Sequence, residues 1–242
     1  MREEAVQGKS AGPTPCGQAS AHMVIREETV RGSGDALGAR SGSEVELHGV
    51  DLVVCSAWVL DPVWLFDGEL AFDDVARALA WLATVFPEVA GRMTPRGVRL
   101  CNSGVPLSEV QPAAAGDTAA APASAFAFVS VEPPRGVLAD VRPATRVADG
   151  SAPIMTVRLS RFPDGSSALG VCLAHALCDG YGAYRLLLLF ARALLRRTDA
   201  QLRRLRQEVV AAGFTLSRAP LKALSPCGLR LLPRCRPPRT RP

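Results

Sequence analysis

The chain has 242 residues, of which 48% are hydrophobic and 21% charged, and its formal net charge is +5. This length and composition exclude a wholly disordered or collagen-like chain and allow one large domain or two small ones. The positive charge is concentrated in residues 217–242, which hold seven basic residues and no acidic one, so the other 216 residues carry −2. We therefore expect no specific nucleic-acid site in the folded part of the chain.

The two ends of the chain differ in composition from its middle. Residues 1–43 are rich in Gly, Ser, Ala and Thr without a sustained strand or helix period, so we predict a disordered N-terminal segment. Residues 213–242 combine proline with arginine, which is typical of an extended, disordered basic tail. The folded domain is expected over residues 44–212.

The elements predicted first along the chain are strands followed by a helix. Apolar, often β-branched residues between Val45 and Leu60 indicate one or two strands. After Asp73 the apolar residues recur every three or four positions, which predicts a helix that ends at Pro87 and Gly91. The residues that carry this helical period are Val75, Leu79, Leu82 and Phe86.

The centre of the chain is expected to hold short strands. Residues 97–101 and 126–131 are candidates, and the Ala/Pro-rich residues 112–122 between them are expected to form a surface loop. Residues 154–161 and 167–174 are predicted to pair as a hairpin. The Pro-Asp-Gly sequence between them favours a turn, because proline presets one dihedral angle and glycine accepts a positive one.

Two helices are predicted after this hairpin. The first starts at Gly180 and runs for roughly 17 residues, with a strongly apolar face. The second spans residues 199–212 and precedes the basic tail. The longest strongly apolar run, around residues 186–190, is far shorter than the ~20 residues a bilayer helix needs. With no secretory or transit signal at the start of the sequence, we expect a cytoplasmic protein with no membrane partner.

The seven cysteines are scattered and odd in number, which favours reduced thiols over a secreted disulfide framework. The spacing of Cys172, His175 and Cys178 resembles part of a zinc site. A tetrahedral zinc site requires a fourth ligand and usually paired close spacings, so we expect no metal. Cys172 is instead expected to be a small core residue of a buried strand.

The candidate chemistry lies in the sequence VCLAHALCDG, residues 171–180. His175 stands where an apolar strand ends, and the carboxyl ends of strands are where ligands of α/β proteins gather. A histidine with a pKa near ~6.5 is mostly neutral at pH 7 and can act as a general base. The residues alone leave a structural alternative open, in which His175 is a satisfied core residue and Asp179 the N-cap of the following helix.

The segment H-A-L-C-D-G resembles the HxxxDG motif of the BAHD acyltransferases. Residues 86–93, F-P-E-V-A-G-R-M, are similar to the F-x-P-L-A-G-R-L segment of that family, and residues 47–51, L-H-G-V-D, resemble its L-S-x-x-D segment. The predicted hairpin stands where the family has the hairpin before its motif. The resemblance covers roughly residues 45–212, in the order and spacing of the family.

The resemblance implies an α/β fold in which helices cover a mixed β-sheet, as in a single chloramphenicol acetyltransferase-like domain. It implies transfer of an acyl group, other than aminoacyl, from acyl-CoA to an alcohol or amine, with His175 as the general base. Asp179 would point away from substrate and form a structural ion pair, and Gly180 would allow a tight exit into the helix. Acyl-CoA is then a co-substrate, no cofactor stays bound, and the residues that contact CoA are not identified.

The resemblance also implies a second domain. Complete family members have two such domains, and the D-F-G-W-G signature of the second does not occur in this sequence. A second chain or domain is therefore expected to complete the cleft. Two alternatives stay open, a non-catalytic remnant or truncated product of such an enzyme, and a condensation-type domain of peptide synthesis. Ala174 replaces the first histidine of the HHxxxDG motif of condensation domains, which counts against the latter.

Overall fold

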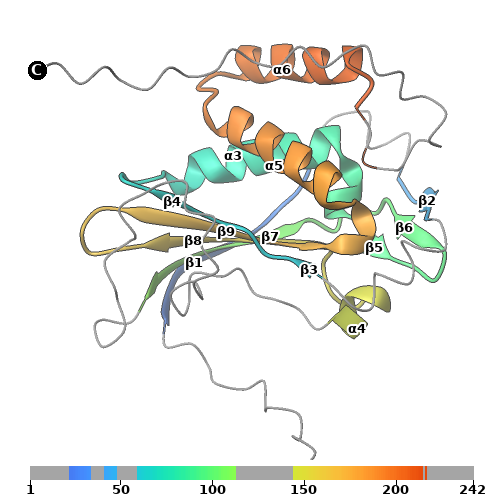
Figure 1. Cartoon of the computed structure of the whole chain (residues 1–242), viewed down its shortest axis with the longest axis horizontal. Helices are drawn as coiled ribbons and strands as arrows, with labels where there is room; N and C mark the ends of the chain where they lie inside the picture. Colours follow the sequence, from blue (N-terminus) through green and yellow to red (C-terminus); the bar gives the residue numbers. More distant parts are fainter. Residues whose placement is uncertain (1–21, 34–40, 48–58, 113–143, 215, 217–242) are drawn as a thin grey trace, which may run out of the picture.

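The central feature of the computed structural model is a six-stranded sheet (Figure 1). The structure describes residues 22–33, 41–47, 59–112, 144–214 and 216. The sheet order is β1-β7-β8-β9-β3, and β4 also pairs with β9; β7 and β8 are parallel, and all other neighbours are antiparallel. The predicted mixed sheet is therefore confirmed. Its strands are β1 (His22–Val30), β3 (Val59–Leu60), β4 (Val63–Phe66), β7 (Val105–Pro112), β8 (Met155–Arg161) and β9 (Ser167–Ala174).

Strands β8 and β9 form the predicted hairpin, with Met155 opposite Leu173 and Arg161 opposite Ser167. Gly165 in the turn has a φ of +83°, a conformation that favours glycine. The Asp164 carboxylate accepts hydrogen bonds from the side chain and the backbone N–H of Ser166, and these lower the pKa of Asp164. The turn thus forms for the local reasons that the sequence indicated.

A small antiparallel sheet accompanies the large one and has the order β2-β6-β5. Its strands are β2 (Glu44–Glu46), β6 (Gly97–Arg99) and β5 (Arg92–Met93). Gly97 lies so close to β2 that a Cβ on it would be 1.9 Å from the carbonyl oxygen of Val45. Only glycine permits this approach of the two strands.

The helices α3 (Phe72–Val85) and α5 (Gly180–Leu194) pack against each other on one side of the six-stranded sheet, and α6 (Asp199–Ala211) lies outside them (Figure 1). All three were predicted from their apolar periods. Trp81 of α3 attaches the outer helix, since its Nε1 donates a hydrogen bond to the carbonyl oxygen of Leu202 at 3.0 Å. The shorter elements are η1 (Pro87–Ala90), η2 (His175–Leu177) and α4 (Ala144–Ala148).

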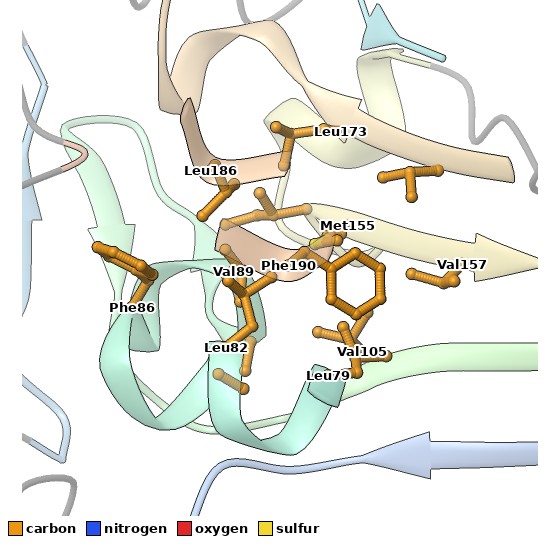
Figure 2. Packing of buried hydrophobic residues seen from close by; sticks show 14 of the residues in the cluster. Leu79, Leu82, Phe86, Val89, Val105, Met155, Val157, Leu173, Leu186 and Phe190 are labelled. Carbon is orange, nitrogen blue, oxygen red and sulfur yellow. The ribbon is translucent and has the colours of Figure 1, made fainter. Parts of the chain in front are cut away.

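The hydrophobic core lies between these helices and the sheet. Phe190 of α5 is fully buried, with side chains from α3, β7 and β8 around it (Figure 2). The inward-facing residues of β8 and β9 alternate along each strand and belong to the same cluster. They are Met155, Val157 and Leu159 on β8 and Leu169, Val171 and Leu173 on β9. This packing holds α5, and therefore the motif that precedes it, against the sheet.

The N-terminal prediction is wrong for residues 22–30, which form strand β1 rather than a disordered segment. The strand lies at the edge of the sheet and pairs with β7 through its backbone. Three consecutive apolar residues, Met23, Val24 and Ile25, are 61%, 47% and 50% exposed. Because the strand buries so little, its sequence does not alternate between apolar and polar residues, and the period that normally reveals a strand is absent.

Two further differences concern the middle and the end of the domain. Strand β7, which lies between β1 and β8, was not predicted, because two prolines and a glutamate interrupt its apolar pattern. The folded part also continues beyond residue 212. Phe214 packs edge-on against Phe86 with ring centroids 5.4 Å apart, and Leu216 is buried in the core.

Several predicted segments lie outside the described residues, namely the strand at 126–131, residues 113–122 of the loop, residues 48–51 of the resemblance, and both outer ends of the chain. Within the described part, no helix combines the length and the apolar content required to cross a membrane.

Candidate functional site

His175 lies where strand β9 ends, as the sequence predicted. All eight residues of β9 are buried, and the last of them, Ala174, donates its backbone N–H to the carbonyl oxygen of Ile154 at 2.9 Å. The chain then makes the single 3-10 turn η2, which begins with His175, and Cys178 is extended. His175 itself is half-buried. The histidine thus directly follows the sheet on one side and, on the other, precedes the N-cap of α5 by four residues.

Asp179 is the N-cap of α5. Its Oδ1 accepts a hydrogen bond from the backbone N–H of Gly182 at 2.7 Å, and its carbonyl oxygen accepts one from Ala183 at 2.8 Å. Within the described part of the chain Asp179 forms no ion pair, so the structural ion pair implied by the resemblance is not found there. Its role in this structure is to hold the first turn of the helix beside the histidine loop.

Gly180 does not have the steric role expected of it. A Cβ on Gly180 would have no atom within 4 Å, and its φ is not in the positive range. The close approach occurs at Gly182 instead, where a Cβ would lie 2.9 Å from the Cβ of Cys178. The tight exit into the helix is therefore real but lies two residues beyond the glycine of the motif.

The two cysteines near His175 are core residues. Cys172 is 5% and Cys178 4% exposed, which confirms the expectation for Cys172. Burial and, as a smaller cause, the negative charge of Asp179 together raise the pKa of the Cys178 thiol to about 12. Among the residues that the structure describes, no three His, Cys, Asp or Glu side chains form a group that could hold a metal ion.

The raised pKa predicts that Cys178 is unreactive. At pH 8 it should react with iodoacetamide at least ~10-fold more slowly than the half-buried Cys101, because the thiolate is the nucleophile. The same shift affects stability. The raised pKa contributes to the free energy of unfolding. This contribution is complete below a pH of about 9, the ordinary pKa of the thiol, and is lost as the pH rises toward about 12.

Peptide mapping by mass spectrometry after timed alkylation measures the first effect, and urea unfolding between pH 8 and pH 11 the second. A Cys178→Ala variant should lack this part of the alkaline decline in stability. Equal labelling of Cys178 and Cys101 in the folded chain would contradict the predicted burial of the thiol.

The structure also shows a charged cluster that the sequence did not reveal. The Nε of Arg161 donates to Glu109 Oε1 at 2.6 Å, and the Nη1 of Arg161 is 3.0 Å from Glu69 Oε1. The partners are far apart in sequence, so no local pattern signals the cluster. The cluster lies at the end of the β8–β9 hairpin that is remote from His175. There Arg161 neutralises the charge of the buried Glu109.

Two cavities formed by the described residues lie away from His175. One cavity lies where β1 meets β7 and β8, and the other adjoins the Arg161 cluster; neither includes His175. The sequence placed the histidine where ligands of α/β proteins gather, and its place at the strand end agrees with that.

Comparisons with known proteins give a family and a fold. The family model described as Transferase family matches residues 43–208. The crystal structure of vinorine synthase matches 74% of this chain and 44% of its own chain, with a TM-score of 0.52 and 18% sequence identity. A search of curated proteins finds no match.

Two other solved structures are similar over shorter or looser alignments. TRI101 of F. graminearum, complexed with coenzyme A and T-2 mycotoxin, is 13% identical; the match covers 66% of this chain and 41% of that chain, with a TM-score of 0.44. The starter condensation domain of rhizomide synthetase is 11% identical; the match covers 74% of this chain and 41% of that chain, also with a TM-score of 0.44. This chain therefore spans less than half the length of each of the three structures.

The match to vinorine synthase shows the fold, a mixed sheet covered by helices of the chloramphenicol acetyltransferase-like kind. At this level of identity it carries no information about substrate.

Proposed function

This chain belongs to the Transferase family, the acyltransferase family indicated by its H-A-L-C-D-G motif, and from that premise we propose that it contributes the histidine-bearing part of an acyl-CoA-dependent acyltransferase. The observation that carries the proposal is the position of His175. It is the first residue after a fully buried strand and is followed within four residues by the N-cap of α5. A general base requires such rigid support.

The proposed reaction is a direct transfer. The oxygen or nitrogen of an alcohol or amine attacks the thioester carbonyl of acyl-CoA while His175 accepts the proton of the attacking group. The new bond to the acyl carbon forms, the carbon–sulfur bond breaks, and the proton passes from His175 to the departing thiolate of CoA. No covalent intermediate with the protein is required, and Asp179 acts only through the shape of the loop.

The negative charge that develops on the carbonyl oxygen of the tetrahedral intermediate must also be stabilised by hydrogen-bond donors. Such donors typically stabilise the transition state by ~3–4 kcal/mol each. We propose that they, and a wall of the acyl-CoA site, come from a second domain or chain, since this chain spans 44% of the vinorine synthase structure and neither described cavity includes His175.

A second candidate function rests on the same two observations. In this candidate the chain is a non-catalytic remnant of the family, retained for binding or regulation. Under this alternative the fold and the motif persist, but His175 accepts no proton from a substrate.

One experiment separates the two candidates. The purified chain is incubated with acetyl-, malonyl- and benzoyl-CoA and a panel of alcohols and amines, while mass spectrometry follows the acylated product and size-exclusion chromatography the oligomeric state. The acyltransferase proposal expects product that depends on both the acyl-CoA and the acceptor. An oligomer that forms no product with any pair would favour the remnant, because a lone monomer lacks the proposed second wall under either candidate.

A further inference from the structure

The first turn of α5 lies unusually close to the loop that carries His175, and the contact is centred on Gly182. A Cβ on Gly182 would be 2.9 Å from the Cβ of Cys178 and 3.3 Å from Oδ1 of Asp179. Carbon atoms in protein interiors pack best at about 3.5–4.0 Å. Because the Cβ of Cys178 is bonded directly to the backbone, no change of rotamer can move it away. A side chain at residue 182 would therefore displace the backbone of the loop or of the helix.

Neither side of this contact is free to move. The hydrogen bond from the Gly182 N–H to Oδ1 of Asp179, at 2.7 Å, draws the helix toward the loop. Cys178 and Ala183 are each 4% exposed and belong to the same hydrophobic core. Close-packed interiors transmit such displacements rather than absorb them. The displacement would reach His175 through the single turn η2, which ends one residue before Cys178.

We propose that Gly182 is a positioning residue, which lets the first turn of α5 approach the 175–178 loop and so sets the orientation of the His175 imidazole. For the role of His175 the inference rests on the proposed acyl transfer. The glycine of the HxxxDG motif does not serve this purpose here, because Gly180 has open space around it and an ordinary backbone conformation.

Gly182→Ala and Gly180→Ala form a matched pair for the test. Alanine is favoured over glycine inside a helix by ~1 kcal/mol, so helix propensity alone predicts that neither variant is destabilised. The contact predicts opposite results. Gly180→Ala should leave the unfolding temperature unchanged or raise it, whereas Gly182→Ala should lower it by roughly 2–10 °C through overpacking. An unchanged or raised temperature for Gly182→Ala would overturn the inference.

An NMR measurement distinguishes positioning from a merely structural role. The chain has three histidines, His22, His48 and His175, so the imidazole resonances can be assigned by substitution to glutamine. The ring-proton chemical shifts of His175 should change in Gly182→Ala and remain as in the parent chain in Gly180→Ala. A loss of thermal stability without any change at His175 would overturn the positioning role.

Removing the other half of the contact provides the rescue. Cys178→Gly eliminates the Cβ that residue 182 would strike, so adding Gly182→Ala to that variant should lower the unfolding temperature less than it does in the parent chain. It should also shift the His175 resonances less. Equal effects in the two backgrounds would show that the contact between residues 178 and 182 is not the cause, and the inference would fail.

None of these measurements requires acyl transfer, so they separate the inference from the proposed function. If the chain proves inactive and the His175 resonances still change in Gly182→Ala but not in Gly180→Ala, the proposed function fails and the positioning inference holds. If His175→Ala abolishes transfer but Gly182→Ala leaves the His175 signals unchanged, only the positioning inference fails.

Discussion

Replacing His175 with alanine is expected to lower the rate of acyl transfer by at least ~10²-fold, because proton transfer by a positioned side chain contributes ~10²–10⁴-fold to a rate. The rate should be measured as kcat/KM, from the formation of acylated product, since the lost interaction acts in the transition state. The histidine is half-buried, so circular dichroism and the unfolding temperature should be recorded for the same sample to show that the variant is folded.

Asp179→Asn provides the contrasting variant for His175→Ala. Asparagine retains a side-chain oxygen that can accept the hydrogen bond from the Gly182 N–H, and it is as good an N-cap as aspartate. If Asp179 acts only through the loop, this variant should lose less than about tenfold of the rate, because the cap is kept. Full activity in His175→Ala would contradict the proposed mechanism and favour the view that the histidine is a satisfied core residue.

Replacing Phe190 with alanine is expected to lower the free energy of unfolding by about 3–5 kcal/mol, the usual cost of truncating a buried aromatic side chain. Phe190 is fully buried on α5, at the centre of the side chains in Figure 2. Marginally stable domains have only about 5–15 kcal/mol in total, so the loss is large. Urea unfolding followed by circular dichroism measures it.

Leu188→Ala on the same helix is the matched control, because Leu188 is 44% exposed. Its substitution should change the free energy of unfolding by no more than ~0.5 kcal/mol, as is usual for surface positions. If the two variants were equally destabilised, the assignment of Phe190 to the core and Leu188 to the surface would be wrong. If Phe190→Ala were as stable as the parent chain, the Phe190 side chain would not be what holds α5 against the sheet.

The parts of the fold that the sequence predicted correctly depend on local patterns. Apolar residues three and four positions apart predict helices α3 and α5. Alternating apolar and polar residues around a Pro-Asp-Gly turn predict the β8–β9 hairpin. Each of these signals lies within one element, so neighbours along the chain suffice to reveal it.

The parts that were missed depend on distant partners. Strand β1 is held by backbone pairing to β7, about eighty residues later, and it buries few of its side chains. The cluster of Arg161 with Glu109 and Glu69 forms only when β7, β8 and the segment after β4 come together. The sequence assigns Phe214 to the basic tail, whereas its contact with Phe86 attaches it to the core.

For the candidate site, the sequence by itself predicted where two residues lie, a histidine at the end of an apolar strand and an aspartate at the N-cap of the next helix. Those assignments follow from the order of residues along one short segment. The tertiary structure alone decided which glycine makes the close contact. Whether a Cβ fits at residue 180 or 182 depends on how closely the first turn of α5 packs against Cys178, and that distance is set by the hydrogen bond to Asp179 and by the core beneath the helix.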